Sequence, residues 1–270
     1  MKTNILTIVA LITLFFVSCV EKIDLELDEI EPRTVIEARI TNYYDGHRVI
    51  ISKSSGYLSD MPSPRISDAR VELSDGERIW LFEESAPGEY VPAESFAGQP
   101  GRLYELLVDT GEETYRAQSL MQQPVEMDSL WVLPHPWISD HHNLIVHFSD
   151  PAKAINYYAW NVYRNDRLLT DSLNKMPFTD GEVFNGRYVS APIYIFQPED
   201  GIPTAGDVVV AEMFSIPQDY FEFLVAMRGN QGSVGGPFVG PPSNIPTNFD
   251  NDALGFFVAK SFSKQKLIIE

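Results

Sequence analysis

The chain is 270 residues long, with 44% hydrophobic and 21% charged residues, a composition typical of folded globular proteins that excludes disorder over the whole length. Its formal charge is -18, from 38 acidic and 20 basic side chains, and such a surface repels the phosphates of nucleic acids. We therefore expect no nucleic-acid partner. The length suits two small domains or one large all-β domain.

The first residues have the layout of a secretory signal. Lys2 precedes an apolar run from Ile5 to Val17, which is followed by charged residues. A helix needs about 20 apolar residues to cross a membrane, and this run is shorter. We predict that residues 1–18 are a cleaved signal peptide.

The residues Phe16-Val17-Ser18-Cys19 resemble a lipobox, in which a small residue precedes a cysteine that receives a diacylglycerol thioether, although Phe16 replaces the usual leucine. Cys19 is the only cysteine of the chain, so it cannot form an internal disulfide. We predict that Cys19 is lipidated and anchors the mature protein, since each buried methylene contributes about 0.8 kcal/mol. An ordinary secretory signal with an incidental cysteine is the alternative.

Residues 19–33 are predicted to form an acidic tether, because like charges keep such a segment extended and solvated. Acid-rich residues directly after the cysteine also resemble the surface-export signal of lipoproteins in the Bacteroidota. This resemblance implies that the protein faces outward from the cell. The acidic side chains are Glu21, Asp24, Glu26, Asp28, Glu29 and Glu31.

From Thr34 onward hydrophobic residues recur at every second position, the period of strands with one buried face. Two hairpins should turn at Asp75-Gly76 and Thr110-Gly111, because glycine supplies the positive φ of tight turns. We predict an N-terminal β-sandwich, Ig-like or transthyretin-like, over residues 34–123. Pro124 restricts the backbone and starts a predicted hinge. Strands are expected at 34–40, 69–73, 78–82, 104–108 and 115–117.

Residues 124–270 are predicted to form a second, fibronectin-like sandwich, so the fold class is all-β with two β-sandwich domains. Turn-rich connections such as Asp150-Pro151 and Asp180-Gly181 separate the strands. The strands are expected at 129–133, 144–148, 157–164, 207–214 and 255–259.

One short helix is expected near the C-terminus. Ser215 suits its N-cap, Pro217 its first turn and Gly229 its end. Its apolar stripe should cover an open end of the sheet core. The stretch 229–252, rich in glycine and proline, is predicted to be an irregular loop.

Several short motifs follow one another along the chain: Cys19, Val35-Ile36-Glu37-Ala38-Arg39-Ile40-Thr41-Asn42, Asp68-Ala69-Arg70-Val71-Glu72-Leu73, Phe148-Ser149-Asp150-Pro151, Asn156-Tyr157-Tyr158, Gly206-Asp207, Pro241-Pro242-Ser243-Asn244-Ile245 and Leu254-Gly255-Phe256-Phe257. In this order they resemble the Bacteroidota lipoproteins grouped as domain-of-unknown-function family 4249 (DUF4249). Thr247-Asn248-Phe249 departs from the family's glycine-containing turn. The resemblance implies an outer-membrane accessory lipoprotein beside a TonB-dependent transporter, and it carries over no activity or catalytic residue.

One stretch gathers most of the histidines: His135, His141, His142 and His147, with Asp140 among them. Imidazole and carboxylate groups bind zinc or copper. Alternation, however, places His147 on the strand face opposite Leu144 and Phe148, and no metal-ligand spacing fixes a geometry. We predict no metal and no cofactor.

Two further motifs fail at the residues that carry their chemistry. Asp250-Asn251-Asp252 resembles the start of a calcium loop, but Leu254 and Ser261 stand where ligands belong, so we predict a polar loop. Gln231-Gly232-Ser233-Val234-Gly235 lacks the first glycine of a nucleophile elbow. We predict no catalytic residue, although a carboxylate pair as in glycosidases is left open.

Aromatic side chains offer either core packing or a binding surface. The candidates for stacking on sugars or docking a protein are Trp131, Trp137, Tyr43, Tyr44 and Tyr57. Most aromatic side chains of a sandwich pack in its core, so we favour core packing over an exposed platform.

We therefore expect a non-enzymatic binding or docking module that is lipid-anchored at the outer membrane, faces the cell exterior and serves a TonB-dependent transporter. A surface glycan-binding or adhesion module that works without a transporter is the alternative. An enzyme is the third choice.

Overall fold

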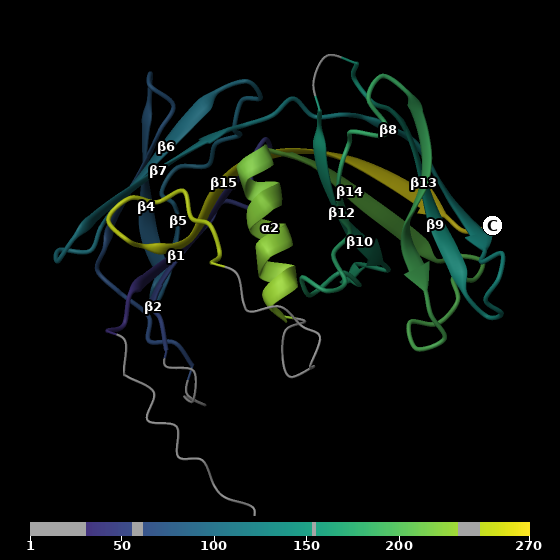
Figure 1. Cartoon of the computed structure of the whole chain (residues 1–270), viewed down its shortest axis with the longest axis horizontal. Coiled ribbons are helices and arrows are strands. Elements are labelled where there is room, and N and C mark those ends of the chain that lie inside the picture. The colour runs from purple at the N-terminus through teal and green to yellow at the C-terminus, as the bar shows by residue number, and fades with distance from the viewer. Residues whose placement is uncertain (1–30, 56–61, 153–154, 232–243) are drawn as a thin grey trace, which may run out of the picture. The chain divides into compact units, whose positions relative to one another are not determined.

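The computed structural model describes residues 31–55, 62–152, 155–231 and 244–270 (Figure 1). The predicted signal peptide, Cys19 and nearly all of the tether lie outside these residues. What the sequence indicates about them therefore stays a prediction. Within the described ranges no helix is long and apolar enough to cross a membrane.

The described residues form mostly strands, with one helix near the C-terminus, as predicted. The strands of the N-terminal half are β1 (Thr34–Thr41), β2 (Arg48–Lys53), β3 (Arg70–Ser74), β4 (Ile79–Ala86), β5 (Glu89–Pro92), β6 (Leu103–Asp109) and β7 (Thr114–Leu120). The later elements are β8 (Met127–Pro134), β9 (His142–Ser149), β10 (Tyr157–Arg164), β11 (Arg167–Leu168), β12 (Phe178–Asp180), β13 (Tyr188–Phe196), β14 (Val208–Ile216), α2 (Gln218–Gln231) and β15 (Leu254–Ile268).

The strands form two sheets. The larger has 12 strands in the order β11-β10-β14-β15-β1-β2-β5-β4-β3-β6-β7, with β12 paired to β10. The smaller has the order β13-β9-β8. Because β15 pairs in parallel with β1 and antiparallel with β14, the last strand of the chain connects the N-terminal and C-terminal parts of the larger sheet.

The long strand β15 bears on the predicted division of the chain. Pro32–Glu270 cluster as one compact unit. Directly after the predicted hinge, the buried Val125 accepts a hydrogen bond at its carbonyl from Ser263 Oγ at 2.7 Å. The two predicted sandwich domains, with a boundary between residues 123 and 124, stay a prediction.

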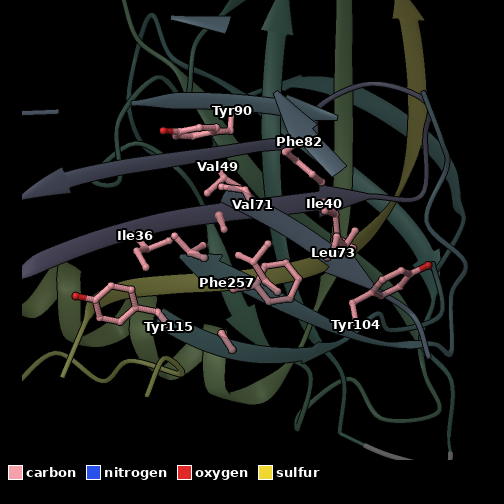
Figure 2. Packing of buried hydrophobic residues seen from close by; sticks show 14 of the residues in the cluster. Ile36, Ile40, Val49, Val71, Leu73, Phe82, Tyr90, Tyr104, Tyr115 and Phe257 are labelled. Carbon is pink, nitrogen blue, oxygen red and sulfur yellow. The ribbon is translucent and has the colours of Figure 1, made fainter. Parts of the chain in front are cut away.

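The first hydrophobic core lies among strands that are far apart in the order of the larger sheet. Figure 2 shows Ile36 of β1 and Tyr104 of β6 packed in one cluster with Phe257 of β15. Residues of the edge strand β7 join this cluster, so the sheet curls until β7 approaches β15. Asn248 connects β7 and β15 by hydrogen bonds. Its side-chain Nδ2 donates to the carbonyl of Gln118 in β7 (3.0 Å), and its Oδ1 accepts from the backbone N–H of Phe257 in β15 (2.9 Å).

The second core lies between the smaller sheet and strands β10 and β14 of the larger one. Val146 and Phe148 of β9 pack with Tyr158 of β10 and Met213 of β14, and all four are fully buried. Alternation along β10 and β14 turns their other residues away from this core. These form a separate apolar layer beneath α2.

The helix α2 differs from its prediction in role and in both ends. It lies against the outer face of the larger sheet, where Leu224 packs with Phe214 and Phe262, rather than over an open end of a core (Figure 1). Ser215 is not an N-cap, because it belongs to β14 and its Oγ has no partner within the described residues. Gly229 does not end the helix, which continues to Gln231 because a single glycine costs only about 1 kcal/mol there.

Most predicted strands are confirmed. The two hairpins turn at the predicted glycine-containing pairs, and the strand predicted at 157–164 coincides with β10. The sequence patterns miss β2, β5 and β13 together with the short strands β11 and β12. They also end β15 at residue 259, whereas it continues to Ile268.

Candidate functional site: the outer face of the smaller sheet

Alternation along β8, β9 and β13 divides their side chains between the second core and solvent. The inward side chains belong to that core. The outward ones form a surface that we call the aromatic face, and its residues are Ser129, Trp131, Leu133, Asn143, Ile145, His147, Tyr188, Ser190, Pro192 and Ile195.

The strand register aligns the aromatic face in rows across the three strands. One apolar row is Trp131, Ile145 and Pro192. The next row is Leu133, Asn143 and Ile195. Hydrophobic side chains therefore adjoin one another in the first of these rows and flank Asn143 in the second, while the row of Ser129, His147 and Ser190 is polar.

The largest side chains of the aromatic face are exposed. Trp131 is 53% and Tyr188 is 63% exposed, and Trp137 in the adjoining β8–β9 loop is 88% exposed. Contiguous apolar patches are the exception on soluble domains and mark interaction sites. This face is therefore the leading candidate for a binding surface.

His147 occupies the middle of the aromatic face. Its ring lies 4.6 Å from that of Trp131 and 6.2 Å from that of Tyr188, measured between centroids. These two rings cover it, so only 7% of this outward residue is exposed. Its Nε2 has no hydrogen-bond partner within the described residues. A buried nitrogen without a partner is costly, so this ring is held in place at the expense of an unsatisfied polar atom.

Charge distinguishes this surface from the rest of the protein. None of the residues of the aromatic face is charged, whereas the whole chain has a formal charge of -18. The centres of protein interfaces are depleted in charged residues and enriched in tryptophan and tyrosine. The composition of the face therefore matches that of an interface centre.

The histidines predicted as one candidate cluster serve separate local purposes. His135 Nδ1 accepts hydrogen bonds from the backbone N–H groups of Trp137 (3.3 Å) and Ile138 (3.1 Å). His141 Nδ1 lies 2.8 Å from the carbonyl of Ser139. These contacts shape the β8–β9 loop. In the part of the chain that the structure describes, no group of three or more His, Cys, Asp or Glu residues is placed to hold a metal ion.

The polar loop predicted at residues 250–252 is confirmed. Asp250 Oδ1 accepts from the backbone N–H of Arg116 (2.6 Å), and Asn251 Nδ2 donates to the carbonyl of Thr114 (2.7 Å). These side chains attach the loop to β7, while Asp252 is exposed. Ser233 of the other rejected motif lies outside the described residues.

Core packing is the wrong prediction for the aromatic candidates that the structure describes. Trp131 and Trp137 are exposed at the smaller sheet, and Tyr43 and Tyr44 are exposed after β1. Tyr57 lies outside the described residues. The sequence patterns missed Tyr188, because they did not predict β13.

The acidic residues of the family-like motifs have structural contacts. Asp150 is buried and accepts hydrogen bonds from the hydroxyl of Tyr158 and from Asn156 Nδ2 (3.2 Å). Burial, and then this carboxylate, raise the pKa of Tyr158. The backbone N–H of Thr204 is the main group that lowers the pKa of Asp207. These motifs therefore hold turns and strands together.

Comparison with known proteins identifies one family. The model of the family described as Domain of unknown function (DUF4249) matches residues 20–266. No curated protein matches the chain.

Proposed function

Because the chain belongs to the DUF4249 family, we propose that it is a non-enzymatic, lipid-anchored accessory protein of the outer membrane whose aromatic face docks onto a TonB-dependent transporter. The observation that carries this proposal is an uncharged aromatic face on a strongly acidic protein. The acidic exterior keeps the protein soluble, while the aromatic face offers apolar area to a partner.

The chemistry of the aromatic face favours a protein as the partner. Two aliphatic side chains, Leu133 and Ile195, lie on the same face as Trp131 and Tyr188, and all four are exposed. Tryptophan and tyrosine are enriched among the residues that dominate protein interfaces, where desolvation of their rings supplies most of the binding free energy. Burial of this mixed surface would add about 25 cal/mol for each Å² of apolar area removed from water.

The lipid anchor in this proposal is Cys19, which joins the protein to the membrane that holds its partner. Tethering raises the effective concentration of the two proteins for each other, so a moderate intrinsic affinity is sufficient. We expect Cys19→Ala to abolish lipid labelling and to move the protein out of the membrane fraction. Unchanged labelling would contradict the anchor, and resistance to proteinase on intact cells would contradict its outward orientation.

Site-specific crosslinking tests the docking surface directly. A photo-reactive amino acid at position 131 of the full, lipidated chain should crosslink to an outer-membrane barrel protein that mass spectrometry identifies as a TonB-dependent transporter. Position 44 is the matched control, because Tyr44 is also an exposed aromatic residue, at 73%, but lies outside the aromatic face. Equal crosslinking from both positions, or none from position 131, would argue against docking through this face.

A glycan-binding module is the second candidate, and one local arrangement favours it. Trp131 and Tyr188 present exposed rings on either side of His147, whose ring is buried between them. Aromatic rings provide an apolar body for such stacking contacts. Retained binding to a glycan array by the purified protein, lost in Trp131→Ala, together with no recovered transporter, would favour this function over docking.

A further inference from the structure

A cavity of about 660 Å³ lies between α2 and the outer face of the larger sheet, away from the aromatic face. Its floor comes from β1, β2 and β15, and α2 supplies the opposite wall through Tyr220, Phe223 and Met227. Its volume falls within the range of about 300 to 1,000 Å³ that small-molecule sites occupy. The space is therefore large enough for a small organic ligand.

The cavity has an apolar end and a basic end, because the strand register orders its floor. At one end Val35 of β1 lies beside Leu254 of β15. At the other end Arg39 of β1 lies directly opposite Arg48 of β2. The run from Val35 to Arg39 spans about 13 Å at about 3.3 Å per residue. The floor thus changes from hydrophobic to cationic along one direction.

The cavity lining contains two arginines, Arg39 and Arg48, and two carboxylates, Glu37 and Asp171, and Asp171 pairs with Lys175 at 2.9 Å. Unpaired positive charge is therefore local to Arg39. Arg48 pairs with Glu89 at 2.6 Å, whereas Arg39 makes no ion pair within the described residues and only donates to the carbonyl of Gly46 at 3.2 Å. Like charges directly opposite each other on neighbouring strands are destabilising. An anion at this end would relieve the repulsion.

One further group near Arg39, the hydroxyl of Tyr220, can donate a hydrogen bond to such an anion. Lys260 of β15 is not part of the cavity lining, and its Nζ lies 3.6 Å from the centre of the Phe214 ring. Tyr220 of α2 lines the cavity, and burial raises the pKa of its hydroxyl to about 12, an effect that the charge of Arg39 reduces. The charge of Arg39 also acts on Lys260.

We propose that this cavity binds a small amphipathic anion, with an apolar chain between α2 and the sheet and a carboxylate at Arg39 and Arg48. The acidic Glu37 lies between the two ends of the floor and selects against ligands whose negative charge is placed mid-chain. The ligand class is a free carboxylate with an unbranched or flat apolar body. A positively charged amphiphile of the same length would meet two guanidinium groups at the basic end.

Calorimetry with two probes of equal chain length tests the charge preference. Decanoate should bind to the purified mature chain, and decylammonium should bind at least 10-fold more weakly. Equal affinity of the two probes, or no binding of decanoate, would overturn the proposal. Vesicles of phosphatidylglycerol provide a second arm, because displacement of decanoate by vesicles would assign the site to a membrane lipid headgroup and overturn a free carboxylate ligand.

Variants locate the binding within the cavity. Arg39→Met should weaken decanoate binding about 10-fold or more, while Arg116→Met, which removes an exposed strand arginine outside the cavity, should leave it unchanged. Ile50→Trp fills the space from the β2 side and should abolish binding. Thermal unfolding of each variant establishes that it is folded. Unchanged binding by a folded Arg39→Met or Ile50→Trp chain would refute the location.

Discussion

Two sheet surfaces on opposite sides of the second core are treated differently by this protein. The outer face of β10, β14 and β15 carries Phe214 and Phe262, and α2 covers it. The outer face of β8, β9 and β13 carries Trp131 and Tyr188, and both remain exposed. Hydrophobic side chains alone therefore do not determine which face is buried. The face beneath α2, the covered face, contributes to folding, whereas the aromatic face remains exposed and is the surface through which we propose docking.

The largest effect should come from the covered face. Leu224 of α2 is 4% exposed within the apolar layer, and truncation of such a leucine costs about 2 to 5 kcal/mol. We expect Leu224→Ala to lower the free energy of unfolding by this amount in urea titrations. The adjacent Val225 is 48% exposed, so Val225→Ala should change stability by about 0.5 kcal/mol or less. Similar values for both variants would show that α2 is not held by this layer.

Lys260 offers a sharper probe of the covered face, because it places an amine beside the buried rings. Burial, and then the charge of Arg39, lower the pKa of Lys260 to about 7 from an ordinary value of 10.5, while Glu212 acts in the opposite direction. Between these two values the unfolded chain binds a proton that the folded chain has released. Folding stability should therefore rise with pH across this window.

Lys260→Met should remove that rise and stabilise the protein at pH 7 by about 1 to 3 kcal/mol, since the apolar side chain has no charge to desolvate. Urea unfolding at several pH values between 7 and 10 measures both effects. Lys264→Met is the control, because the side chain of Lys264 is 53% exposed and its Nζ pairs with Glu212 at 3.5 Å. A pH profile that is equally steep in Lys260→Met would contradict the role of this amine.

Local patterns in the sequence predicted much of the fold, since strand alternation and glycine turns act over a few residues. The same rules missed β2 and β13 for identifiable reasons. In β2, Val49, Ile50 and Ile51 are consecutive, which hides the alternation because Ile50 faces the cavity while its neighbours face the core. In β13, Pro192 marks the run as unsuited to a strand, but β13 lies at the edge of its sheet, where proline is tolerated.

The sites depended on contacts that no local pattern contains. The sequence drew attention to Trp131 but favoured core packing for it. Its exposure follows from the fact that none of the described elements covers β8 on this side, which is a property of the tertiary fold. The cavity needs β1, β2, α2 and β15 together. The end of β15 was missed because its last residues, from Lys264, alternate mostly between polar and charged side chains beside β14.

Two buried histidines differ in whether their ring nitrogens have hydrogen-bond partners. His47 Nδ1 accepts from the backbone N–H of Thr41 (3.3 Å), so the ring carries its proton on Nε2, which donates to the carbonyl of Phe96 (2.7 Å). Both nitrogens are used, whereas the Nε2 of His147 has no hydrogen-bond partner in the described part of the chain.

Burial lowers the pKa of His47 from its ordinary value of 6.5. As the pH falls below 6.5, the unfolded chain takes up a proton that the folded chain does not, so the free energy of unfolding should decrease between pH 6.5 and 5. His47→Gln cannot titrate and should show a shallower loss in the same range, measured by urea unfolding. An identical profile would assign the acid sensitivity to other groups.

The smallest effect on stability should come from a substitution on the aromatic face. Trp131→Ser removes a half-exposed side chain whose main neighbour is the ring of His147, so the free energy of unfolding should change by about 1 kcal/mol or less. The same substitution should strongly reduce crosslinking or co-purification of the proposed transporter, measured on membranes in mild detergent. A loss of stability as large as that of Leu224→Ala would place Trp131 among the residues that hold the fold together. The covered face and the aromatic face would then not differ in their contribution to stability, and docking would need another surface.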